Sequence, residues 1–197
     1  MILQTLIFNS HTYELGSLIN NGDLSLLLLK PISISLYFLS QDLADKALNA
    51  FMLLLEIGLL LLFIHLPFHL PSLGLVLVWF LPLFILASLL YFALGFLFGL
   101  VGFWSRDVWA PRFLFLVFLE FATGALFPLD MLPKTWQIWL PFTPFPYLLF
   151  YPLKLFLGQL ERPFFYLAMA FFWLLVLALL DLFIWHRGMR RYEAEGR

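Results

Sequence analysis

Long runs of hydrophobic residues dominate the chain, and polar residues gather between them. Four runs predict transmembrane helices, because about 20 mainly apolar residues cross a bilayer. The second run is longer than a crossing requires, which indicates tilt or an interfacial start, and the third is short. Transmembrane β-strands alternate and need only about 10 residues, so the pattern predicts an all-α, polytopic transmembrane bundle. The four runs are Ala47–Leu66, Leu73–Trp104, Phe113–Phe127 and Pro163–Trp185.

The composition supports a lipid environment. Of 197 residues, 63% are hydrophobic and 12% are charged, whereas soluble domains carry about 25% charged residues. A net charge of −1 gives no basic field for nucleic acid. The chain has no cysteine, which excludes disulfides, thiolate metal sites and cysteine nucleophiles.

Lysine and arginine predict the orientation. A four-span arrangement places eight on one side and three on the other, and cytoplasmic loops carry the excess. Both termini are therefore expected in the cytoplasm. The first group is Lys30, Lys46, Arg106, Arg112, Arg187, Arg190, Arg191 and Arg197; the second is Lys134, Lys154 and Arg162.

Residues 9–46 mix polar and apolar positions. Asn20-Asn21-Gly22-Asp23 is a strong turn signal, and a helix can restart after Pro31. Two interpretations stay open: an interfacial amphipathic helix that leads into the first span, or a surface for a cytoplasmic partner. The expected apolar stripe comprises Ile32, Leu36, Leu39 and Leu43.

Residues 128–162 are rich in proline and aromatic side chains. Seven of the 12 prolines lie from Pro128 to Pro163. Prolines break helices, and Trp and Tyr favour the headgroup level. We expect one or two short helices on or in the outer leaflet. They form either an ordinary interfacial loop or a re-entrant element that caps a translocation route.

The whole chain is predicted to be one transmembrane domain. It comprises a cytoplasmic region (9–46), three spans (47–127), the external hairpin (128–162), the last span (163–185) and a cytoplasmic tail (186–197).

Three segments resemble the type-2 ABC exporter permeases, especially a bacterial branch that works with a separate ATPase. INNGDLSLLLLKPIS (Ile19–Ser33) resembles the cytoplasmic signature after the family's second span. TGALFPLDMLP (Thr123–Pro133) resembles the end of its fifth span. LPFTPFPYLLFYPLKLFLG (Leu140–Gly158) resembles its external hairpin. The likeness covers nearly the whole chain.

The resemblance implies two subunits of six spans each, around a pathway, with an ATPase dimer docked below. It implies that Ile19–Lys46 contacts the ATPase and that Pro128–Gly158 is the re-entrant hairpin. The four spans match the family's third to sixth, and MILQTLIF resembles the tail of its second. The implied location is the bacterial cytoplasmic (inner) membrane. The residues expected at the ATPase contact are Gly22, Asp23, Lys30 and Pro31.

No catalytic constellation stands out in the sequence. The chain has no GxxxxGK[ST] motif, so it cannot hold ATP in a P-loop, and we expect no enzymatic activity of its own. His65 and His69 have a spacing that could suit a metal, but no third ligand accompanies them. No cofactor, metal site or catalytic residue is predicted.

Two carboxylates lie inside predicted spans, where charge is costly. Glu56 and Glu120 are therefore candidates for the transport pathway, or else partners in inter-helix hydrogen bonds. Asp181, four residues before Trp185, is interpreted as an interfacial charge that snorkels or pairs.

Gly95 and Gly99 form a GxxxG motif, and Gly102 follows. Small residues let helices approach closely, either within one subunit or between two subunits of a dimer.

The sequence thus favours a permease subunit of an ABC exporter. A non-transporting membrane scaffold or truncated permease paralogue is the alternative. An intramembrane enzyme that uses the acidic residues is least supported, because no nucleophile or metal set accompanies them.

Overall fold

The computed structural model describes residues 2–63 and 72–192 and is all-α within them, which confirms the predicted fold class. The α-helices are α1 (Ile2–Ile7), α2 (Glu14–Asn21), α3 (Leu24–Leu28), α4 (Ile34–Phe63), α5 (Leu73–Leu75), α6 (Leu81–Gly99), α7 (Trp109–Ala122), α8 (Lys134–Gln137), α9 (Phe150–Phe156) and α10 (Pro163–Met189). A π turn, η1 (Val76–Phe80), and 3-10 turns η2 (Leu100–Phe103), η3 (Leu129–Met131), η4 (Leu140–Phe142) and η5 (Phe145–Tyr147) join them.

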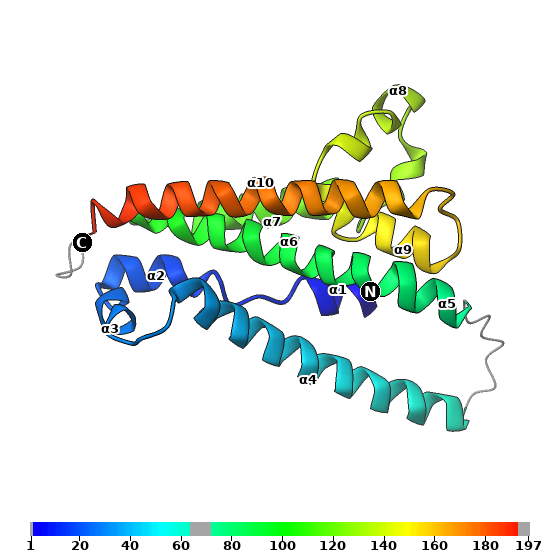
Figure 1. The fold of residues 1–197 in the computed structure, drawn as a ribbon, viewed down its shortest axis with the longest axis horizontal. Coiled ribbons are helices and arrows are strands. Elements are labelled where there is room, and N and C mark those ends of the chain that lie inside the picture. Colours follow the sequence, from blue (N-terminus) through cyan, green and yellow to red (C-terminus); the bar gives the residue numbers. More distant parts are fainter. Residues whose placement is uncertain (1, 64–71, 193–197) are drawn as a thin grey trace.

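The long helices run roughly along one axis of the molecule (Figure 1). α6 and α10 pack side by side and form the centre of the bundle. α1 lies between α6 and α4, while α4 diverges from α6 towards its C-terminal end (Figure 1). Leu54 and Leu59, in that half of α4, are accordingly exposed.

Two helical runs of the described chain are long and apolar enough to cross a membrane. They are Val76–Phe103, which joins η1, α6 and η2, and Pro163–Met189. These runs correspond to the predicted second and fourth spans. The first predicted span begins inside α4, which has 30 residues. Its end at Leu66 and the pair His65 and His69 lie outside the described residues.

The sequence predicts the third span at Phe113–Phe127, but the helix found there, α7, runs from Trp109 to Ala122. α7 begins at Trp109, since the Asp107 carboxylate accepts hydrogen bonds from the N–H groups of Trp109 and Ala110 at 3.0 and 3.2 Å. It ends at Ala122, because Gly124 has a φ of 83°, a left-handed conformation that stops helices. Its 14 residues rise about 21 Å, which is short for a crossing.

A proline explains the irregular turn in the central helix. Pro82 has no backbone N–H to continue an α-helical ladder. Immediately before it, the Leu81 N–H bonds the Val76 carbonyl five residues back, and η1 spans Val76–Phe80. A single π turn thus accommodates the missing N–H of Pro82, and the helix continues beyond it.

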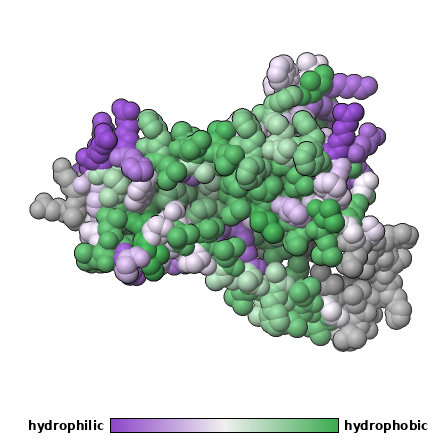
Figure 2. Space-filling view, in the orientation of Figure 1, coloured by the Kyte–Doolittle hydropathy of each residue, from purple (hydrophilic) through white to green (hydrophobic). Residues whose placement is uncertain are grey.

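The two ends of the long axis are more polar than the middle, which is covered by hydrophobic side chains (Figure 2). We name them by their helices. The α2–α3 end also carries the turn between α6 and α7 and the end of α10, whereas the α8–α9 end carries the segment between α7 and α10 (Figure 1). An apolar belt between polar ends is the arrangement that a bilayer requires.

The predicted hairpin at residues 128–162 is a series of short helices and turns. α8 projects from the bundle (Figure 1), and Trp136 and Trp139 on and beside it are exposed. α9 instead packs against η1 and α6. The Tyr147 side chain is fully buried, and its hydroxyl donates to the Pro141 carbonyl at 2.6 Å.

Most of the apolar stripe predicted at the start of α4 is exposed. Ile32, Leu36 and Leu43 are exposed, and Leu39 is only half-buried. A different face of α4 packs inward. Lys46 on that face donates a hydrogen bond to the Asn9 carbonyl in the segment before α2. That inward face comprises Ile34, Phe38, Asp42 and Lys46.

Candidate functional site

The turn between α2 and α3 contains the first predicted contact residues. Gly22 ends α2 with a φ of 81°, and its N–H bonds the Ile19 carbonyl at 3.3 Å. Glycine adopts this conformation without strain, so the Asn-Gly-Asp signal correctly marks the turn. Gly22 itself is buried, whereas Asp23 is exposed.

Beyond this turn, the chain presents a mixed apolar and charged surface. The Leu29 side chain is 82% exposed and that of Leu26 is 63% exposed. Lys30 and Pro31 are also exposed, with the Lys30 ammonium 5.3 Å from the centre of the Tyr37 ring. We call Asp23, Leu26, Leu29, Lys30 and Pro31 the α3 surface.

A tyrosine after α10 ties this region to the last span. The Tyr192 hydroxyl donates to the Gly22 carbonyl at 2.7 Å and accepts from the Ser25 N–H at 3.0 Å. Its ring meets Phe103 edge-on, at 6.2 Å between centroids. Gly188 leaves room for Phe103, since a Cβ there would lie 2.2 Å from that ring. α2–α3, η2 and α10 therefore form one packed unit.

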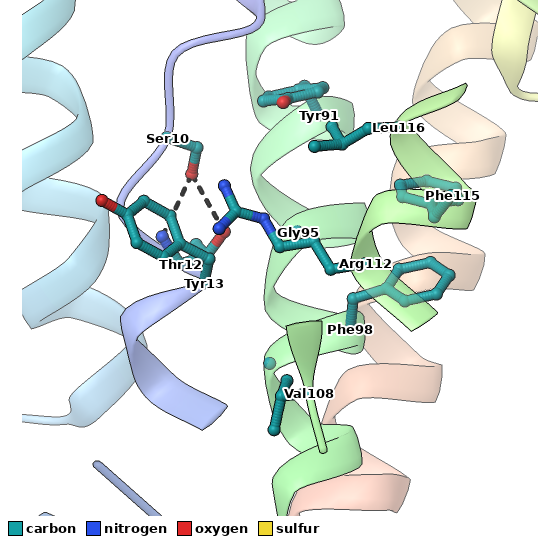
Figure 3. Close-up of a pocket in the computed structure, with 11 residues that line it drawn as sticks. Ser10, Thr12, Tyr13, Tyr91, Gly95, Phe98, Val108, Arg112, Phe115 and Leu116 are labelled. Atoms are coloured by element: carbon teal, nitrogen blue, oxygen red, sulfur yellow. Dashed lines mark hydrogen bonds between the residues drawn. The ribbon is translucent and has the colours of Figure 1, made fainter. Parts of the chain in front are cut away.

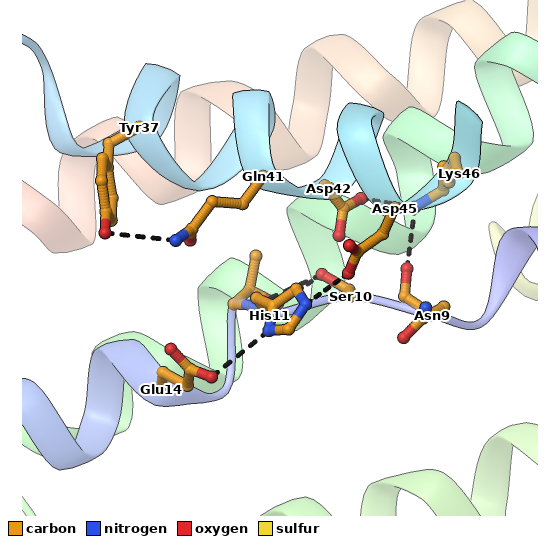
Figure 4. Close-up of polar contacts among 10 residues, drawn as sticks. Asn9, Ser10, His11, Glu14, Tyr37, Gln41, Asp42, Asp45 and Lys46 are labelled. Carbon is orange, nitrogen blue, oxygen red and sulfur yellow. Dashed lines mark hydrogen bonds and ion pairs between the residues drawn. The ribbon is translucent and has the colours of Figure 1, made fainter. Parts of the chain in front are cut away.

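The segment before α2 joins α4 through ionisable side chains (Figure 4). His11 bonds Glu14 at 3.2 Å through Nδ1 and Asp45 through Nε2. These hydrogen bonds, that to Glu14 first, and the two negative charges raise the pKa of His11 above its ordinary value. The protonated imidazole is thereby favoured as a bridge between α2 and α4.

A second ion pair lies beside this contact on α4. The Lys46 ammonium contacts the Asp42 carboxylate at 2.5 Å and donates to the Asn9 carbonyl at 2.8 Å (Figure 4). Asp42 is 2% exposed and Lys46 is 9% exposed. Because unpaired charges are costly to bury, this pair fixes the orientation of the first half of α4.

The glycine motif of α6 packs against the same segment. A Cβ on Gly95 would lie 2.2 Å from Thr12 Oγ1, and one on Gly99 would lie 2.7 Å from the Thr12 carbonyl oxygen. A Cβ on Gly102 would lie 2.8 Å from the Gly16 carbonyl oxygen. In this structure the motif therefore makes a contact within one chain.

An arginine on α7 also contacts the segment before α2. The Arg112 guanidinium extends past Gly95 (Figure 3) and lies 3.8 Å from the centre of the Tyr13 ring. Ser10 and Thr12, beside it, share a hydrogen bond of 3.0 Å. The cation–π contact links α7 to the segment before α2.

The two predicted pathway acids occupy different environments. Glu120 on α7 accepts hydrogen bonds from Gln4 on α1, at 2.9 Å to Oε1 and 3.2 Å to Oε2. Glu56 is exposed on the divergent half of α4. The structure does not bring them together, and neither lines the large cavity described next.

A cavity of about 730 Å³ lies between the start of α4, α6 and α10. Asp181 on α10 is one of its lining residues and is only 8% exposed. The interpretation of Asp181 as an interfacial charge is therefore wrong. α10 continues to Met189, so Asp181 lies two turns inside the helix. Its position near the end of the predicted span concealed this burial.

Comparisons with known proteins identify the family. The searches of curated proteins and of solved structures gave no match. A family model described as "ABC-2 family transporter protein" matches residues 1–196. The match covers the helical bundle, the α3 surface and the segment with α8 and α9. The chain therefore belongs to the ABC-2 family of transporter proteins.

Proposed function

We propose that this chain is the permease subunit of a type-2 ABC exporter and couples ATP hydrolysis by a separate ATPase to cargo movement. Its family and its apolar helices support a membrane permease, and permeases of this family generally work with an ATPase partner. The 197 residues contain no P-loop motif, so the partner supplies the ATP site.

The proposal includes an orientation and an assembly. The α2–α3 end faces the cytoplasm of a bacterium, because cytoplasmic segments carry the excess of Lys and Arg. The elements at this end carry Lys30, Arg106, Arg112, Arg187, Arg190 and Arg191. The α8–α9 end faces outward. Two permease subunits, identical or different, enclose the pathway within the cytoplasmic membrane, as the family resemblance implies. Glu56 and Glu120 remain candidates to line that pathway.

The observation that carries the proposal is the α3 surface. Leu26 and Leu29 are aliphatic and exposed beside two opposite charges, Asp23 and Lys30. An exposed apolar patch with a polar rim is typical of a protein-binding site. An ATPase that docks there contacts the permease outside the apolar belt.

The same region can pass movement into the membrane. Tyr192 connects the Gly22 turn to α10 through two hydrogen bonds. Phe103 contacts both Tyr192 and Trp185, at 6.2 and 5.8 Å between ring centroids. A displacement of α3 by the ATPase therefore reaches α10, which packs along α6.

Co-purification tests the proposal. The chain, tagged at its C-terminus, is solubilised gently from membranes of cells that also express its own ATPase. We expect a P-loop ATPase at stoichiometric amount with the wild type. The double variant Leu29→Asp/Lys30→Glu places charge on the apolar patch and reverses its cation, so the ATPase should be lost.

A matched control exists at the α8–α9 end. Met131 is 77% exposed and Lys134 is exposed, so Met131→Asp/Lys134→Glu makes the same chemical changes far from the α3 surface. This variant should retain the ATPase. Absence of the ATPase from a folded wild-type chain would favour the non-transporting scaffold instead.

A further inference from the structure

The large cavity has an apolar lining with one acidic group. It has about 730 Å³, within the range of about 300–1,000 Å³ that is usual for sites of drug-sized ligands. Apolar side chains come from three directions: the start of α4, α6 and α10. They include Ile34, Leu89, Phe92, Phe96, Leu174 and Trp185.

Asp181 is the exception in this lining. Its side chain is more than nine-tenths buried, and its Oδ1 atom finds no hydrogen-bond partner among the residues that the structure describes. A buried carboxylate without a partner is costly. α10 holds it there, between Ala178 and Leu182 on the face that lines the cavity.

The charges around the cavity indicate what can neutralise Asp181. Among the described lining residues there is no Lys or Arg. His186 also lines the cavity, but its Nδ1–H donates to the Leu182 carbonyl at 2.7 Å and it makes no hydrogen bond to Asp181 Oδ1. The remaining polar lining comes from the small hydroxyl groups of Ser33 and Ser35. A positively charged ligand would supply the missing counter-charge.

We propose that this cavity binds a hydrophobic monocation, with its positive charge at Asp181 and its apolar body against α6 and α10. The inference rests on the proposed function, since it gives the chemical class of the transported cargo. The cavity lies next to the α3 surface, with Ile32 and Ser33 in its lining. Movement of α3 would therefore reshape the site.

Binding to the purified chain tests the proposal without the ATPase. Wild-type protein in nanodiscs of neutral lipid is dialysed against tetraphenylphosphonium, with protein-free nanodiscs as the blank. Tetraphenylborate has nearly the same size and shape but the opposite charge. We expect saturable binding of the cation and none of the anion. Equal binding of both ions, or of neither, overturns the proposal.

Variants on α10 locate the site. Asp181→Asn preserves the shape but removes the charge, so affinity for the cation should fall at least about tenfold, because the Coulombic attraction to the phosphonium is lost. Ala178→Phe fills the cavity and should abolish binding. Leu179→Phe adds the same ring at the next residue, which is 66% exposed and outside the lining, and should leave binding intact.

Two results on folded variants would contradict the site: undiminished affinity in Asp181→Asn, or equal affinity in Ala178→Phe and Leu179→Phe. The outcomes are independent of ATPase capture. Cation binding without a co-purified ATPase would leave the cavity assigned and remove the proposed function. Capture of the ATPase without cation binding would support the proposed function and remove the assignment of the cavity.

Discussion

The two polar ends of the molecule are both built from short helices, and both expose tryptophan and aliphatic side chains. The α2–α3 end exposes aliphatic Leu26 and Leu29 beside opposite charges, and Trp109 at the start of α7. The α8–α9 end exposes Trp136, Trp139, Met131 and Ile138 and buries Tyr147 completely. Tryptophan at a membrane boundary is accounted for by lipid headgroups. The proposed docking of a protein partner at Leu26 and Leu29 therefore rests on their position beside Asp23 and Lys30 and on the Tyr192 contact, and not on the type of apolar side chain.

The ends also differ in how a tyrosine hydroxyl is used. Tyr192 joins the α2–α3 turn to α10, whereas Tyr147 bonds the Pro141 carbonyl within its own segment. One end is thus connected to α10 through a tyrosine hydroxyl, whereas the tyrosine hydroxyl at the other end bonds only within its own segment. The comparison predicts that equal chemical changes at the two ends have unequal effects on coupling.

The largest expected effect on stability concerns close packing at the α2–α3 end. Gly102→Ala places a Cβ 2.8 Å from the Gly16 carbonyl oxygen, and such overpacking costs about 1–3 kcal/mol. Gly74→Ala, where nothing lies within 4 Å, should not destabilise the chain. Thermal unfolding in detergent measures both, and equal melting temperatures would show that the contact does not tighten the bundle.

The next effect distinguishes stability from coupling. Tyr192→Phe and Tyr147→Phe each remove a hydroxyl with a buried or half-buried partner, so each should cost about 1 kcal/mol. Only Tyr192→Phe should also lower transport-coupled ATPase activity, because it disconnects α3 from α10. The measurement is ATP hydrolysis by the reconstituted complex. An equal loss of coupling in both variants would remove the distinction between the ends.

A smaller effect depends on pH. The pKa of His11 lies above its ordinary value of 6.5, raised first by its hydrogen bond to Glu14 and then by that to Asp45. Its stabilising contribution is complete below 6.5 and is lost as the pH rises through the folded-state pKa. Thermal stability should therefore fall on alkalinisation in the wild type more than in His11→Gln. Parallel pH profiles would mean that His11 does not bridge α2 and α4.

The smallest effect is expected at the α8–α9 end. Lys154 pairs with Asp130 at 2.6 Å, and the Asp130 side chain is 54% exposed. Exposed ion pairs contribute about 0–1 kcal/mol. Lys154→Met should leave the melting temperature nearly unchanged and ATPase capture intact. Loss of the ATPase in this variant would indicate that the ATPase docks at the α8–α9 end.

The sequence predicts the long helices well because lipid imposes a length and a continuous apolarity on them. It also locates the Gly22 turn, since an Asn-Gly-Asp sequence has a local conformational preference. The face of a helix that packs inward is less predictable from the sequence. The inward face of α4 contains Asp42 and Lys46 because partners supplied by the segment before α2 make their burial possible.

The same limit applies to the candidate sites. Glu120 and Asp181 look alike as acids within apolar runs, yet Gln4 satisfies the first and the second faces a cavity. The difference depends on helices distant in sequence. The Tyr192 contact was not predicted either, because it joins residues 170 positions apart.

Cross-linking from single cysteines tests the central claim most directly. The chain has no cysteine, so Leu29→Cys and Met131→Cys each introduce one thiol at opposite ends. In membranes that contain the chain and its ATPase, a short thiol-to-amine cross-linker should join the ATPase to Leu29→Cys and not to Met131→Cys. Capture by Met131→Cys alone, or by neither variant, would contradict the assignment of the α3 surface as the docking site.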